Sequence, residues 1–117
     1  MKTTKRHFKL FCDEVTRHCN RLGLQEWRLD FVHEDSGSAY ATLNPEYLDR
    51  CVTICLHTEW DETITPLSDG AIMATALHEA IELLVIDLWV LALAKWVTRD
   101  EIETARHTLV RRLEKLL

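Results

Sequence analysis

The sequence predicts a single α+β domain over residues 1–117, with an N-terminal helix, a small three-stranded antiparallel sheet and two C-terminal helices. Three observations predict this fold class. Near the N-terminus apolar residues recur every three or four positions, which is helical periodicity. From residue 27 the segment WRLDFVHED alternates with a period of two, and CVTICL at 51–56 contains β-branched residues, as is typical of strands. From residue 71 onward the helical periodicity returns, and 117 residues are enough for one core without disulfides.

The first helix is expected over residues 4–22. Its apolar residues fall on one face, and Gly23 supplies a C-terminal stop. The residues of this face are Phe8, Phe11, Val15, Cys19 and Leu22.

Three strands are expected over residues 27–35, 39–44 and 51–56. The first two are separated by the turn sequence DSGS at 35–38, and the second and third by PEYLD at 45–49. Because short connections favour antiparallel pairing of strands that follow one another in the chain, we expect an antiparallel meander.

Two helices follow the strands. A long helix over residues 71–95 is apolar nearly all round and is therefore expected to be central and buried, with Thr65 or Ser68 as a cap. Thr98 and Glu101 form a capping box that begins the closing helix. The packing face of the closing helix is expected to hold Ile102, Ala105, Leu109, Leu113 and Leu116.

The composition limits the classes of function. The net charge of −5 disfavours a general nucleic-acid-binding protein, which usually carries a basic excess. The N-terminal sequence MKTTKRHFKLFC has no apolar stretch of signal-peptide length, and the apolar stretch at 83–94 is too short to span a bilayer. We therefore expect a cytoplasmic protein without membrane association, and we interpret its four cysteines as reduced thiols, mostly small core residues.

The motif LHEAIELLV at residues 77–85 places three ionisable side chains in an apolar helix. On a helical wheel of ~100° per residue, Glu82 lies about 40° and Glu79 about 100° from His78. This short polar arc is expected to form the floor of a local pocket. Two interpretations remain open: a metal site, or a buried hydrogen-bonded network with basic residues such as Arg106 or Arg111 of the closing helix.

The metal interpretation rests on the chemistry of the three side chains. A histidine and a glutamate four residues apart can bind one ion together, since both ligate zinc. Glu79 points to the side of the pair, where a carboxylate can take a proton from a water activated by the metal. This is the arrangement of the H-E-x-x-H motif, with Glu82 in place of the second histidine.

A catalytic zinc site normally has three protein ligands. The closing helix offers Glu101, Glu103 and His107. Glu103 and His107 fall on the flanks of its apolar face, so the spacing permits His107 as a ligand without selecting it.

The segments ALHEAIELLVIDL and WVTRDEIETARHTLVRRLEKLL, together with the strand that begins at Trp27, resemble a group of small phage-encoded zincin-like proteins. The resemblance implies a minimal gluzincin-type fold, with metal ligands His78, Glu82 and His107 and with Glu79 as the general base. The chain departs from the common pattern because glutamate stands where the second histidine is usual, and histidine where a glutamate is often found. Zinc is the expected metal, and Fe²⁺ or Mn²⁺ suits the same set.

The function predicted from these observations is a zinc metallopeptidase that cleaves a protein or peptide substrate, held as an added strand at an exposed sheet edge. The alternative is a non-catalytic phage protein that binds a host protein, with the metal structural or absent.

Overall fold

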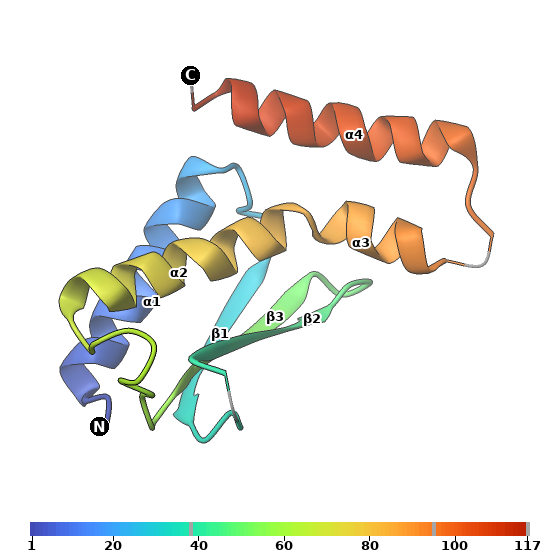
Figure 1. Ribbon diagram of the computed structural model, residues 1–117. Helices are drawn as coiled ribbons and strands as arrows, with labels where there is room; N and C mark the ends of the chain where they lie inside the picture. The colour runs from blue at the N-terminus through green and yellow to red at the C-terminus, as the bar shows by residue number, and fades with distance from the viewer. Residues whose placement is uncertain (38, 95, 117) are drawn as a thin grey trace.

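A computed structural model of the chain describes residues 1–37, 39–94 and 96–116. It has the predicted α+β arrangement, with an N-terminal helix, a three-stranded sheet and C-terminal helices (Figure 1). The elements are α1 (Lys5–Arg21), β1 (Arg28–Glu34), β2 (Ala41–Glu46), β3 (Cys51–His57), α2 (Asp69–Leu84), α3 (Ile86–Leu93) and α4 (Arg99–Glu114). Among the described residues, no helix is both long enough and apolar enough to cross a bilayer.

The sheet is mixed, so the predicted antiparallel meander is wrong. The strand order is β1-β3-β2, with β1 parallel and β2 antiparallel to β3. The central place of β3 follows from its side chains, because Val52, Ile54 and Leu56 are fully buried. The most apolar strand therefore lies between the other two, and β2 forms an outer edge of the sheet.

The helices cover one face of the sheet (Figure 1). α1 packs on α2 and β1, and α2 also contacts β2. The predicted apolar face of α1 is confirmed, since Phe11, Val15, Cys19 and Leu22 are buried and Phe8 packs against the core. The layer of helices thus places α2 directly above the edge strand β2.

The cysteines are all free thiols. Cys19 and Cys55 are buried, as predicted for small core residues, whereas Cys12 and Cys51 are half-buried. Burial raises the pKa of the Cys19 thiol to about 11, which keeps it protonated and unreactive at neutral pH.

The long helix predicted over 71–95 is instead two helices, α2 and α3, which are separated at Val85; its predicted end at residue 95 lies outside the described residues. Val85 has φ −94° and ψ 4°, outside the helical range, although its N–H still donates to the oxygen of Ile81 at 3.2 Å. The direction of α3 is fixed by Asp87, which accepts a hydrogen bond from Arg50 at 3.0 Å. This ion pair joins α3 to the turn between β2 and β3.

The capping predictions are confirmed. Ser68 caps α2 by accepting a hydrogen bond from the N–H of Ala71 at 3.0 Å. Thr98 and Glu101 form the reciprocal capping box at the start of α4.

The packing predicted for the last two helices is only partly correct. In α4, Ala105 is buried, but Ile102 and Leu113 are 45% and 43% exposed. The long helix is not buried all round either, because Leu77 and Ile81 of α2 are 41% and 45% exposed. α4 lies along α3, on the side away from the sheet (Figure 1), and its Leu113 lines a cavity together with Leu77 and Ile81 of α2.

Candidate metal centre

α2 brings together the side chains of His78, Glu79 and Glu82. Each offers one ligand atom, and these atoms lie within 4.8 Å of one another. Among the residues that the structure describes, His78, Glu79 and Glu82 are the His, Cys, Asp or Glu side chains that lie close enough together, as a group of three, to share a metal ion. The helical spacing that predicted a common arc therefore does bring the three groups to one place.

His78 and Glu82 form an exposed pair. Nε2 of His78 lies 3.1 Å from Oε1 of Glu82, and the two side chains are 67% and 51% exposed. The alternative of a buried network is thus wrong for these two residues, whereas His78 does line a cavity, as expected for the polar arc. Arg111, a partner considered for that network, donates to the backbone oxygen of His107 at 3.3 Å.

Glu79 has a different environment from its neighbours. It is only 4% exposed, and its Oε2 is buried without a hydrogen-bond partner among the described residues. Burial, reinforced by the charge of Glu82 and opposed by that of His78, raises the pKa of the Glu79 carboxyl from 4.5 to about 7. A carboxyl with this pKa can exchange a proton near neutral pH, as a general base must.

A cavity of about 460 Å³ opens beside this carboxyl. His78, Glu79 and Thr75 of α2 line one side of it, and Ala41 of β2 lines another. The remaining lining residues are Ala39, Tyr40, Trp60, Thr65, Ala71 and Ala74. The Glu79 carboxyl, whose Oε2 has no partner, and the exposed His78 ring therefore lie at a cavity large enough for part of a substrate.

Tyr40 and Trp60 form an aromatic wall that sequence reasoning missed. Their rings stack with centroids 4.2 Å apart. The Tyr40 hydroxyl donates to the oxygen of Asp61 at 2.7 Å, and Nε1 of Trp60 donates to the oxygen of Thr65 at 2.9 Å. The backbone N–H of Trp60 donates to the oxygen of Met1 at 2.7 Å, so the N-terminus also holds this wall. The sequence signal that could have indicated this wall is Trp60, a large aromatic residue within the otherwise polar segment HTEWDE.

His107, the predicted third ligand, lies elsewhere. It is exposed on α4 and does not belong to the cluster around His78. Because α4 packs along α3, the arrangement offers the two ligands His78 and Glu82 with Glu79 beside them. A role for His107 stays a prediction, and it requires α4 to lie closer to the cluster than it does here.

The donor set suits a divalent metal ion. An imidazole and two carboxylates are the ligands that zinc, iron and manganese accept. The orphaned Oε2 of Glu79 is a buried polar atom without a partner, and such an atom ordinarily costs stability unless it binds something. A cation near this oxygen would also remove the mutual repulsion of Glu79 and Glu82.

The raised pKa of Glu79 predicts how the stability of the metal-free chain depends on pH. Because the folded state holds this proton more tightly than the unfolded state, the free energy of unfolding falls as the pH rises from 4.5 to about 7. The loss is about 3 kcal/mol, from ~1.4 kcal/mol per pKa unit. Glu79→Gln should remove this loss of stability, because glutamine does not titrate. Urea unfolding with a chelator present should therefore show that the variant is more stable than the wild type at pH 8 and nearly as stable as the wild type at pH 4.

The difference between the unfolding free energies of Glu79→Gln and the wild type at each pH removes the effect of every titrating group that both proteins share. Glu103→Gln on α4, which removes an exposed ion pair with Arg99, is the control and should differ only slightly from the wild type at every pH. Parallel profiles for wild type and Glu79→Gln would contradict the buried position of this carboxyl.

Comparisons with models of known protein families, with curated proteins and with solved structures found no match to the chain. The resemblance to small zincin-like phage proteins therefore stays a prediction, and the functional argument depends on the site itself.

Proposed function

We propose that the chain is a metal-dependent hydrolase that cleaves peptide bonds, with His78 and Glu82 as metal ligands and Glu79 as the general base. The observation that carries the proposal is the Glu79 carboxyl, which is buried, is unpartnered at Oε2, lies within 4.8 Å of two possible ligands and lines a cavity. A buried carboxyl oxygen without a partner is costly to keep, and active sites are where such groups are found.

The two kinds of residue have separate tasks. When bound, a divalent ion would polarise the substrate carbonyl and lower the pKa of a water molecule. His78 and Glu82 would hold the ion on the open side of α2, where substrate has access. Glu79 would accept the proton of the attacking water at Oε2 and pass it to the leaving amine.

The edge strand β2 supplies a place for an extended substrate. It pairs with β3 along one side only, and α2 contacts it from above. A peptide that adds to the free edge would run past the cavity at Ala41 and below the His78–Glu82 pair. The stacked Tyr40 and Trp60 rings would limit its path at one end.

A second candidate is a non-catalytic protein that binds another protein, such as a host protein of a phage. Exposed apolar side chains on the outer side of α2 and on α3 and α4 favour it, because such patches mark interaction surfaces. They include Met73, Leu77, Ile81, Trp89 and Val110, which are 39% to 60% exposed.

Cleavage of a peptide mixture separates the two candidates. Protein purified without affinity metals would be loaded with zinc and incubated with a casein digest, and the products identified by mass spectrometry. We expect new peptide termini that disappear with a chelator and return with added zinc. Stoichiometric zinc without cleavage of any peptide, or no zinc binding at all, would favour the binding protein.

A further inference from the structure

A second cavity lies beside Glu82. It has a volume of about 340 Å³ and shares Glu82 with the candidate metal centre. Its lining consists of Leu43, Pro45, Glu82, Val85, Ile86 and Trp89. Apart from the Glu82 carboxyl at one side, these side chains are apolar, which is the usual composition of a binding cavity with one orienting polar group.

The edge strand joins this cavity to the first one. Side chains at alternate positions of a strand point to the same face, so Ala41, Leu43 and Pro45 all face the helices. Ala41 lines the first cavity, whereas Leu43 and Pro45 line the second. A peptide along β2 would therefore meet both cavities in turn, with the metal ligands near the point between them.

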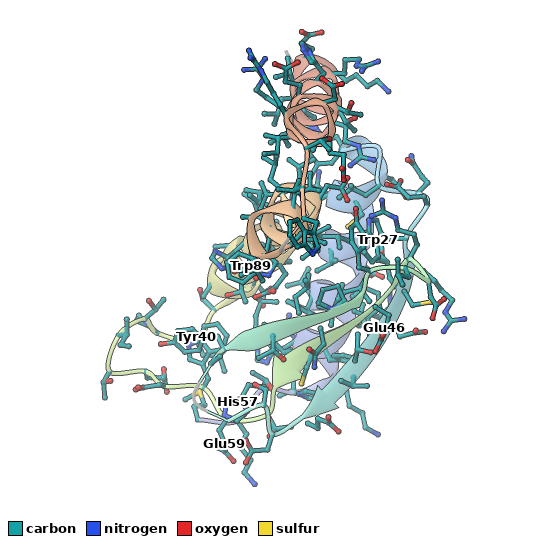
Figure 2. The ribbon with its side chains drawn as sticks, turned by 90° about the vertical axis from the view of Figure 1, so that its right-hand side faces the viewer. Trp27, Tyr40, Glu46, His57, Glu59 and Trp89 are labelled. Carbon is teal, nitrogen blue, oxygen red and sulfur yellow. The ribbon has the colours of Figure 1, made fainter. Side chains whose placement is uncertain are left out.

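The end of α2 and the start of α3 build the opposite wall. Val85 and Trp89 follow Glu82 by three and seven residues, a spacing that keeps side chains on one side of a helix. Val85 belongs to the last turn of α2, where its N–H donates to the oxygen of Ile81 at 3.2 Å. It also belongs to the first turn of α3, where its oxygen accepts from the N–H of Trp89 at 3.1 Å. Figure 2 shows Trp89 beside the helices on the same side of the molecule as Tyr40 of the first cavity.

The walls are left partly open to solvent. Trp89 is 60% and Val85 37% exposed, although both lie next to a candidate active site. Filling the cavity with an apolar side chain would remove water from both residues and from the incoming group, which favours binding. The volume exceeds 300 Å³, the lower end for small-molecule sites, so a side chain as large as that of phenylalanine is within its size.

We propose that this cavity binds a bulky apolar side chain of the peptide substrate, such as Leu or Phe, and so selects the bond that is cleaved. The proposal rests on the proposed function, since it takes the peptide along β2 and the metal between the cavities as given. Val85 and Trp89 are then specificity-determining residues. The Glu82 carboxylate and the lack of any basic side chain in the lining disfavour an acidic side chain at this position.

The test measures binding of two metal-chelating probes to zinc-loaded protein by calorimetry: the hydroxamates of N-acetylphenylalanine and N-acetylglycine. The phenylalanine probe should bind the wild type roughly ten to one hundred times more tightly, as expected for burial of one large apolar side chain. Val85→Phe, which fills the second cavity, should bring the ratio of the two affinities close to one. Ala74→Phe, which fills the first cavity, is the matched control and should keep the ratio.

Zinc binding is measured first, because it separates this proposal from the proposed function. If zinc does not bind, the proposed function fails and this proposal with it. If zinc binds but the wild type holds both probes equally well, only the proposal for the second cavity is overturned. It is also overturned if Ala74→Phe abolishes the preference while Val85→Phe keeps it, since the first cavity would then be the side-chain site.

Discussion

Glu79→Gln is expected to lower the rate of metal-dependent peptide cleavage by roughly 10²- to 10⁴-fold, the contribution usual for one general base. Glutamine has nearly the same shape as glutamate but cannot accept a proton at neutral pH. The variant should still bind zinc with an affinity close to that of the wild type, because His78 and Glu82 remain. The measurement pairs initial rates on a cleaved casein peptide with a zinc titration of the same protein sample.

Zinc affinity also distinguishes the two roles open to Glu79, whose carboxyl lies within ligand distance of the other two groups. If the variant loses both activity and zinc, Glu79 is itself a ligand and the water must be activated by another group. If it keeps both, Glu79 has no role in the reaction. Glu103→Gln serves as the control for removing one acidic side chain from the protein, and its rate should stay at the wild-type value.

His78→Ala and Glu82→Ala should each weaken zinc binding by more than about 100-fold. Loss of a partner that only orients a ligand already costs ~10- to 100-fold, and each of these variants removes a ligand itself. Because both side chains are more than half exposed, the substitutions should leave the fold intact. Competition with a chromogenic chelator gives the affinities, and circular dichroism checks the helices.

The zinc affinity of His107→Ala is the informative comparison for the His78→Ala and Glu82→Ala variants. With His107 exposed on α4 and outside the cluster, the variant should bind zinc as the wild type does. A loss equal to that of His78→Ala would mean that α4 approaches α2 when metal is bound, and the third ligand predicted from the resemblance would be correct.

Local signals in the sequence predicted local structure well. The capping residues Ser68 and Thr98, the buried face of α1 and the approximate limits of the three strands follow from side-chain chemistry within a few neighbouring residues. The common position of His78, Glu79 and Glu82 was also predictable, since helical spacing alone brings these side chains together.

Arrangements that depend on distant parts of the chain could not be predicted in this way. The order of the strands is set by which one buries most apolar surface on assembly, whereas connection length pointed to a meander. No proline or glycine marks the break at Val85, and the ion pair of Asp87 joins residues far apart in the sequence. The burial of Glu79 depends on how the segments around Tyr40 and Trp60 pack beside α2, which no local pattern encodes.

The central place of β3 constrains how the chain can assemble during its synthesis. β1 is made first, yet the strand that it pairs with ends only at His57, so its hydrogen-bonding groups stay unpaired until then. The hairpin of β2 and β3, in contrast, closes over a short turn and can form in ~1–10 μs. We therefore expect the hairpin to provide the template onto which β1 docks from the opposite edge, a non-local step that sets the pace of folding.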